Sequence, residues 1–169
     1  HREHSGRVPV RAIPPGGGKL FGRSAVLESL RAWLLEPSPG IVTLIGPGGS
    51  GKTRLALAIA SDDAVMQRCL DGVVVADLSA VRDAQQVLPA IAVALGWVES
   101  ATHWTVQTVA ERLQGQRLCL VLDNFEQVID AAADVARLAA LLPASSFLVT
   151  SRQPLMVRAE RCLPVAPLP

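Results

Sequence analysis

The sequence predicts an α/β domain with a mainly parallel sheet, and three observations carry this prediction. Short, continuously apolar runs rich in β-branched residues recur along the chain, as in strands that are covered on both faces. Stretches with apolar residues at helical spacing alternate with those runs, which is typical of strand–helix–strand units. The 169 residues, of which 50% are hydrophobic and 18% charged, suit one folded domain.

The predicted elements follow one another in a regular order. Strands are expected at residues 41–45, 73–76, 118–122 and 147–150, with a fifth at 162–165. Helices are expected at residues 53–60, 83–95, 106–113 and 128–142, after a first helix that Ser24 caps and Pro37 ends. Residues 1–18 are rich in Arg, Pro and Gly without apolar periodicity, which predicts a flexible arm or linker before a core domain at 19–169.

Composition excludes several classes of protein. The formal net charge is +1, so the domain lacks the basic field of a nucleic-acid binder, and we expect no direct nucleic-acid binding. No run approaches the ~18 apolar residues of a membrane span, and the polar start lacks the apolar segment of a signal peptide. The three cysteines form neither a disulfide framework nor a zinc pattern. These features indicate a cytoplasmic domain without membrane contact, and the missing initiator methionine indicates a piece of a longer chain.

One glycine-rich segment carries the clearest chemistry. The eight residues from Gly46 to Thr53 match the phosphate-binding loop G-x-x-x-x-G-K-[ST], and they lie between a predicted strand and a predicted helix. Glycines let backbone N–H groups approach a phosphate closely, and the following helix directs its positive end at the same anion. Lys52 would supply charge for the β- and γ-phosphates, and the Thr53 hydroxyl would bind Mg²⁺. The predicted phosphate contacts are Gly46, Gly48, Gly49, Ser50, Gly51, Lys52 and Thr53.

Two further segments follow buried strands. Asp123 comes directly after the strand at 118–122, where a protein with a phosphate-binding loop holds Mg²⁺ through a carboxylate. We therefore predict Thr53 and Asp123 as metal ligands, with a turn-capping role as the alternative for Asp123. Arg152 follows the strand at 147–150 and could reach a γ-phosphate; the alternative is a solvated loop arginine.

These motifs occur in an order that resembles one family. Phe21-Gly22-Arg23 with Glu28, the phosphate-binding loop, LVLDNFE at 120–126 and LVTSR at 148–152 together look like a STAND-class P-loop NTPase of the NB-ARC and apoptotic-ATPase branch. The domain is similar to the ATPase domains of large bacterial transcriptional regulators, which often carry a LuxR-type DNA-binding domain. The resemblance covers roughly residues 19–169 and implies a three-layer fold with a five-stranded sheet of order 5-1-4-3-2.

The resemblance also implies a ligand and residue roles. ATP or ADP would bind with Mg²⁺, and Phe21 and Arg23 would line the adenine site. Arg54 would lie near the base or ribose, and Arg152 would sense the γ-phosphate. The predicted catalytic group is Lys52, Asp123, Asn124 and Arg152.

Two departures from the family pattern concern hydrolysis. Many members have a second acid after the metal-binding Asp, as a base for the attacking water, whereas this chain has Asn124, which can orient water but cannot accept a proton. Glu126 follows two residues later, and its role stays open. The family also closes its site with a helical and a winged-helix domain, which do not fit after Pro169. We therefore expect slow or absent hydrolysis.

The sequence favours a regulatory ATP/ADP switch that biases the packing of the neighbouring helical and winged-helix domains, with nucleotide-dependent self-association as a further expectation. Two alternatives stay open. An ATP-dependent kinase of a small molecule would need an acceptor pocket and a mobile lid, for which no lid-sized insertion is evident. A degenerate interaction module would keep the fold without nucleotide, and the intact Lys52, Thr53 and Asp123 count against it.

Overall fold

A computed structural model of the chain describes residues 23–98 and 103–167. The predicted arm over residues 1–18 and the predicted adenine contact Phe21 lie outside the described residues. Within the described part, the alternation of strands and helices follows the predicted order, with one additional short helix.

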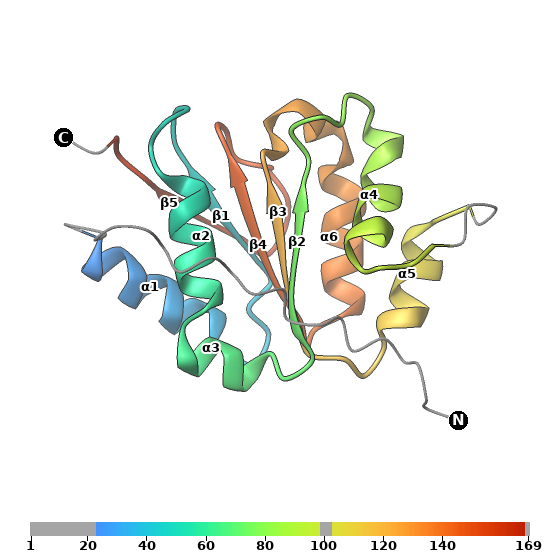
Figure 1. Cartoon of the computed structure of the whole chain (residues 1–169), viewed down its shortest axis with the longest axis horizontal. Helices are drawn as coiled ribbons and strands as arrows, with labels where there is room; N and C mark the ends of the chain where they lie inside the picture. The colour runs from blue at the N-terminus through green and yellow to red at the C-terminus, as the bar shows by residue number, and fades with distance from the viewer. Residues whose placement is uncertain (1–22, 99–102, 168–169) are drawn as a thin grey trace.

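Five strands form one sheet (Figure 1). Its order is β2-β3-β4-β1-β5, and every neighbouring pair is parallel. Read from the other edge, this is the expected order 5-1-4-3-2, so the predicted sheet is confirmed. Because all strands run in one direction, their carboxyl ends meet at one edge of the sheet. The strands are β1 (Ile41–Ile45), β2 (Gly72–Asp77), β3 (Leu118–Asp123), β4 (Ser146–Ser151) and β5 (Glu160–Pro164).

Helices cover both faces of the sheet and complete the three predicted layers (Figure 1). One face carries α1 (Ser24–Leu34), α2 (Lys52–Ala60) and α3 (Asp63–Arg68). The other face carries α4 (Val87–Ala94), α5 (Val106–Leu113) and α6 (Ala132–Leu141). The buried apolar residues divide into two clusters, one on each side of the sheet, as expected for strands that are covered on both faces.

Two helices on the second face begin later than predicted. The stretch expected as one helix at 83–95 is divided into a 3₁₀ helix, η1 (Ala84–Gln86), and α4. Pro89 lies in the first turn of α4, where its missing N–H costs no hydrogen bond. The helix expected at 128–142 begins at Ala132, after the 3₁₀ stretch η2 (Phe125–Ala131), in which Val128 has a non-helical φ of −129° and ψ of 37°.

The N-termini of α1 and α3 also differ from what the sequence predicted. Ser24 is the first residue of α1 and not its cap; Arg23 takes the cap position without a side-chain capping bond. The short helix α3 was missed, although Asp62 caps it by accepting the N–H groups of Ala64 and Val65. Asp62 is a cap of the preferred type, which is the local signal that could have predicted this helix.

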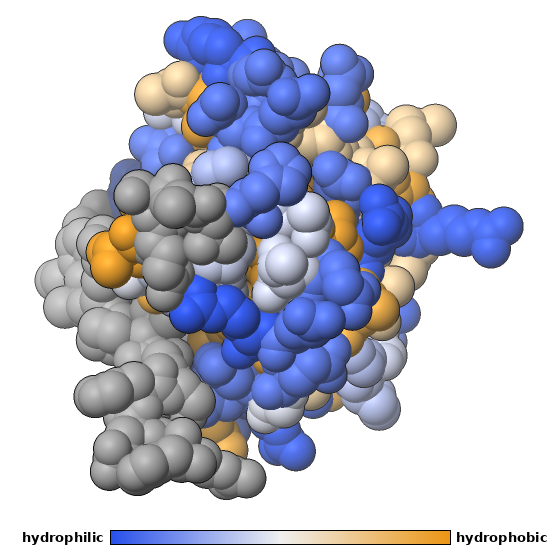
Figure 2. Space-filling model, turned by 90° about the vertical axis from the view of Figure 1, so that its right-hand side faces the viewer, coloured by the Kyte–Doolittle hydropathy of each residue, from blue (hydrophilic) through white to orange (hydrophobic). Residues whose placement is uncertain are grey.

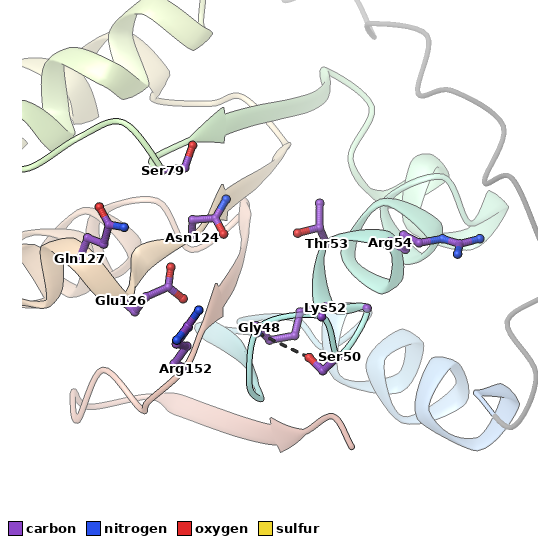
Figure 3. Close-up of a pocket in the computed structure, with 12 residues that line it drawn as sticks. Gly48, Ser50, Lys52, Thr53, Arg54, Ser79, Asn124, Glu126, Gln127 and Arg152 are labelled. Atoms are coloured by element: carbon purple, nitrogen blue, oxygen red, sulfur yellow. Dashed lines mark hydrogen bonds between the residues drawn. The ribbon is translucent and has the colours of Figure 1, made fainter. Parts of the chain in front are cut away.

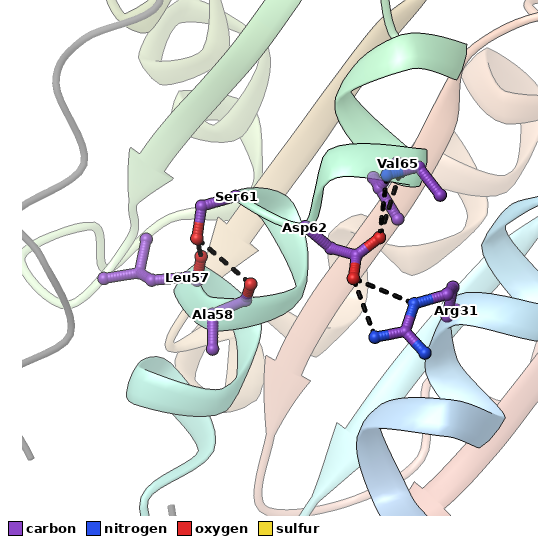
Figure 4. Close-up of polar contacts among 7 residues, drawn as sticks. Arg31, Leu57, Ala58, Ser61, Asp62 and Val65 are labelled. Carbon is purple, nitrogen blue, oxygen red and sulfur yellow. Dashed lines mark hydrogen bonds and ion pairs between the residues drawn. The ribbon is translucent and has the colours of Figure 1, made fainter. Parts of the chain in front are cut away.

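Asp62 also joins two helices on the first face (Figure 4). Arg31 of α1 donates Nε and Nη2 to Asp62 Oδ2, at 2.8 and 2.7 Å. The guanidinium, together with the two capping N–H groups, lowers the pKa of Asp62. The neighbouring Ser61 hydroxyl donates to the carbonyl oxygens of Leu57 and Ala58 at the end of α2. This turn therefore ends α2, starts α3 and ties both to α1.

The surface on the α4–α6 side of the molecule is mainly hydrophilic, with hydrophobic side chains scattered among polar ones (Figure 2). Across residues 23–98 and 103–167, no helix is both long and apolar enough to cross a membrane.

Candidate functional site

A cavity of about 570 Å³ lies at the carboxyl edge of the sheet, between the loop that follows β1 and the segments that follow β2, β3 and β4 (Figure 3). We call residues 46–54 the loop wall and residues 77–79 with 123–127 the strand-end wall. Most predicted site residues line this cavity. The lining residues are Gly48, Gly49, Ser50, Gly51, Lys52, Thr53, Arg54, Ser79, Asn124, Glu126, Gln127 and Arg152.

The backbone of the loop wall has glycines in left-handed conformations. Gly49 and Gly51 have φ of +80° and +86°, a region that residues with a Cβ rarely adopt. Gly51 directly precedes the nine-residue helix α2, so the positive end of that helix points at the loop. At Gly46 there is no room for a side chain, because a Cβ would lie 2.5 Å from the carbonyl oxygen of Val165 and 2.9 Å from Ser50 Oγ.

Lys52 folds back onto the loop wall. Its Nζ donates to the carbonyl oxygens of Gly46 and Pro47, at 2.6 and 2.9 Å. Burial lowers the pKa of Lys52, the nearby Arg152 guanidinium adds to this effect, and the carboxylate of Glu126 opposes it. Lys52 therefore lies within electrostatic reach of both Glu126 and Arg152.

Thr53 and Asp123, the two predicted metal ligands, are in contact across the site. The Thr53 hydroxyl donates to both carboxylate oxygens of Asp123, at 2.9 and 3.1 Å. Thr150, at the end of β4, donates its hydroxyl to Asp123 Oδ1. Asp123 is only 6% exposed, so these hydroxyl groups supply the hydrogen bonds that a buried carboxylate requires.

Asn124 links three strand ends. It has a left-handed backbone with φ of +63°, and its N–H donates to Thr150 Oγ1 at 2.9 Å. Its side-chain Nδ2 donates to Asp77 Oδ1 at 3.0 Å and to Asp123 Oδ2 at 3.3 Å. The N–H of Ser79, and after it the Asn124 amide, lowers the pKa of Asp77.

Arg152 and Glu126 lie beside the loop wall. The Arg152 guanidinium packs against Gly48, where a Cβ would lie 2.8 Å from Nη2. In Figure 3 the Glu126 carboxylate lies on the same side of the cavity as Arg152. The cavity is therefore bordered by the cations Lys52 and Arg152, the carboxylate of Glu126 and the backbone of the loop wall.

Of the predicted adenine contacts that the structure describes, Arg54 lines the cavity and Arg23 does not. Arg23 is buried, and its Nη2 donates to the carbonyl oxygens of Ser50 at 2.7 Å and Ala166 at 2.8 Å. It therefore holds the loop wall and the segment after β5 together. Arg54 borders the cavity, and its side chain extends away from Lys52 and Thr53 in Figure 3.

Three residues of the strand-end wall were missed by the sequence interpretation: Asp77, Ser79 and Gln127. Asp77 is the register partner of Asp123 on the neighbouring strand. The rule that ligand-binding side chains follow parallel strands at their carboxyl ends could have found Asp77 and Ser79. Gln127 is held by Arg82, which also donates to the carbonyl oxygen of Ser79; this contact has no local signal in the sequence.

The residues present fit a phosphate ligand with Mg²⁺. The hydroxyl of Thr53 and the carboxylate of Asp123 are hard oxygen donors at hydrogen-bond distance, which suits a cation that keeps several waters and takes few protein ligands. In the part of the chain that the structure describes, no group of three or more His, Cys, Asp or Glu side chains could hold a metal.

Comparison with known proteins identifies the family of the chain. The NB-ARC domain family matches residues 23–161. A Mycobacterium tuberculosis protein named as a candidate HTH-type transcriptional regulator is 36% identical over 121 residues, which is 71% of this chain and 13% of that protein. An uncharacterized M. tuberculosis protein is 32% identical over 150 residues, or 88% of this chain and 37% of that protein. The chain thus spans well under half the length of these relatives.

The fold also matches solved structures. The structure of the Aeropyrum pernix ORC2 protein, described as ADPNP–ADP complexes, superposes with a TM-score of 0.59 at 18% identity, over 92% of this chain and 52% of that one. At this identity the match shows the fold alone, which is that of P-loop NTPases. With the family match over most of its length, the chain belongs to the NB-ARC domain family, a nucleotide-binding P-loop NTPase family of the STAND class.

Proposed function

We propose that this domain is an ATP/ADP-binding regulatory switch with slow Mg²⁺-dependent hydrolysis, in a bacterial signalling protein or transcription regulator. One observation carries the proposal: the glycine-rich loop, Lys52 and Thr53 border one cavity at the carboxyl edge of the sheet, and the Thr53 hydroxyl is bound to Asp123. A fold that only docks other proteins has no need of this combination.

The loop wall would bind the phosphates. Backbone N–H groups of the loop and the start of α2 would surround them, and Lys52 would exchange its two carbonyl bonds for phosphate oxygens. Thr53 and Asp123 would hold Mg²⁺, which supplies charge compensation for the phosphate oxygens. Arg152, packed against Gly48, would contact the γ-phosphate and so distinguish ATP from ADP.

The base would lie near Arg54 and the predicted contact Phe21. Arg23 would have a structural role beside this region, because its guanidinium binds the Ser50 and Ala166 carbonyl oxygens. It would have to break these hydrogen bonds to reach a base. The preference for an adenine base is implied by the family resemblance. Comparing the binding of ATP with that of GTP tests this preference.

Output would lie in other parts of the parent protein. One relative is named as a candidate HTH-type transcriptional regulator, which supports a role in transcription control. That relative is far longer than the matched segment, so it has room for such output domains. Nucleotide would bias the packing of neighbouring helical and winged-helix domains, and self-association would follow nucleotide state. A cytoplasmic location fits this role.

Thermal melting with ATP, ADP, GTP or no nucleotide, each with and without Mg²⁺, tests the binding function. Adenine nucleotide at ~100 times its Kd should stabilise the fold by about 2.7 kcal/mol. Lys52→Ala should abolish this gain, with Lys19→Ala as the matched control outside the motif. A Lys52→Ala protein that responds like wild type contradicts the assignment, and ATP consumption only with an added acceptor would favour a kinase.

The metal assignment has its own test. Asp123→Asn keeps the shape of the side chain but removes the charge, so it should weaken nucleotide binding in Mg²⁺ and change little in a chelator. An equal loss under both conditions would remove the metal role of Asp123.

A further inference from the structure

The strand-end wall contains a carboxylate with no role in the function proposed above. Asp77 ends β2, directly opposite Asp123 in the register of the two strands. Its Oδ1 accepts the N–H of Ser79 at 3.0 Å and the Nδ2 of Asn124 at 3.0 Å. Asp77 does not itself line the cavity, whereas Ser79 and Asn124 both do.

The partners of Asn124 fix the orientation of its amide. An ionised carboxylate can only accept hydrogen bonds, so the amide nitrogen must face Asp77 and Asp123. The carbonyl oxygen is then directed to the other side. In Figure 3 this oxygen lies on the side of Asn124 that faces Thr53 across the cavity.

The backbone of Asn124 is held as firmly as its side chain. Its left-handed conformation costs free energy for a residue with a Cβ, and its N–H is anchored on Thr150, which also donates to Asp123. The amide oxygen is therefore presented by a residue whose backbone and side-chain nitrogens are both bound. Such an oxygen can accept a hydrogen bond from a water but cannot take its proton.

We propose that Asp77 is a positioning residue for hydrolysis: it holds the Asn124 amide so that its oxygen orients the attacking water. This rests on the proposed function, because it needs ATP on the loop wall. The water oxygen bonds to the terminal phosphorus, the bond from that phosphorus to the bridging oxygen breaks, and the water's proton passes to the phosphate product. Hydrolysis is slow because the wall orients water without supplying a base at position 124.

The first test needs no nucleotide. Asn124 is the only asparagine among the 169 residues, so selective ¹⁵N-asparagine labelling gives one side-chain NH₂ pair by NMR. Its solvent exchange should be at least about tenfold slower in wild type than in Asp77→Ala, since hydrogen bonds to charged groups are the stronger ones. Equal exchange rates in the two proteins would overturn the proposed geometry.

The second test separates binding from turnover. Asp77→Ala should lower kcat about tenfold or more and leave the Kd for Mg-ATP, measured by titration calorimetry, within about twofold of wild type. Asp77→Asn keeps an acceptor oxygen and should restore most of kcat, which shows that position and not charge is required. An unchanged kcat in Asp77→Ala overturns the proposal.

Asp71 provides the matched control. It lies at the other end of the same strand pair, and its carboxylate accepts the N–H of Arg117 at 2.7 Å. Asp71→Ala should lower the melting temperature without changing kcat or the exchange of the Asn124 amide. A wild-type protein that binds Mg-ATP but never hydrolyses it overturns this proposal and leaves the switch intact. A protein that binds no nucleotide overturns the proposed function, and the exchange measurement still decides the geometry.

Discussion

The two walls of the cavity are held in different ways. The loop wall is fixed by backbone packing and by carbonyl contacts: Gly46 lies against Val165, and Arg23 binds the Ser50 and Ala166 carbonyls from behind. The strand-end wall is fixed by side-chain hydrogen bonds among Asp77, Asp123, Asn124 and Thr150. Changes at the positions that fix the loop wall, Gly46 and Arg23, should therefore lower folding stability, and changes in the strand-end wall should mainly affect ligand binding and hydrolysis.

The difference also shows in the left-handed residues. The loop wall uses glycines at positive φ, whereas the strand-end wall uses Asn124, whose side chain makes the bonds described above. Glycine adopts a positive φ without backbone strain. Asparagine is strained in that conformation, but its side chain can make polar contacts that glycine cannot. The following predictions test this contrast.

Arg23→Ala should give the largest loss of stability. It leaves the carbonyl oxygen of Ser50, in a buried contact, and that of Ala166, in a partly buried one, without their guanidinium partner. Each such group costs about 1–3 kcal/mol, so urea unfolding should show a loss of about 2–4 kcal/mol. Arg31→Ala, on the exposed face of the same helix, is the control and should lose much less. A loss as small as that of the control would mean that the Arg23 contacts do not stabilise the loop wall.

Gly46→Ala and Gly48→Ala should differ in folding stability, although the two glycines lie only two residues apart. At Gly46 the new Cβ would meet a backbone oxygen at 2.5 Å, so the chain must shift, at a cost of about 1–3 kcal/mol. At Gly48 it meets only the end of the Arg152 side chain, at 2.8 Å, which can move. Gly48→Ala should therefore keep its stability and lose the preference for ATP over ADP. Equal destabilisation in thermal melts would contradict this distinction.

The same contrast explains what the sequence could predict. The loop wall is one contiguous motif, and the strand order and the Thr53–Asp123 pair followed from motifs in known order. The role of Arg23 could not be predicted, because its partners lie 27 and 143 residues away and are backbone oxygens with no residue signature. The Asp77–Asn124 contact depends on the register of β2 and β3, which an alternation of apolar residues does not determine in strands covered on both faces.

Asp62→Ala tests how much a carboxylate outside both walls contributes to the free energy of unfolding. It removes the cap of α3 and the partner of Arg31, which should cost about 1 kcal/mol at neutral pH. Because the folded pKa of Asp62 is lowered, its contribution is complete above the unfolded pKa of about 4 and is lost as the pH falls through the folded value. Unfolding free energies of the two proteins should therefore converge as the pH falls below the folded pKa of Asp62. A difference that persists there would mean that packing, and not charge, is what Asp62 contributes.

Asn124→Gly should have the smallest effect on stability and gives the sharpest separation of the two walls. The change removes the amide and its bonds to Asp77 and Asp123, but it also removes the strain of a Cβ at φ +63°. These effects oppose each other, so urea unfolding should stay within about 0.5 kcal/mol of wild type. Asn124→Ala loses the same bonds and keeps the strain, and should be about 1 kcal/mol less stable than Asn124→Gly. Both variants should bind Mg-ATP and hydrolyse it more slowly than wild type, because neither retains the amide oxygen. If Asn124→Gly unfolded as readily as Arg23→Ala, the strand-end wall would be a structural element like the loop wall, and the contrast between them would fail.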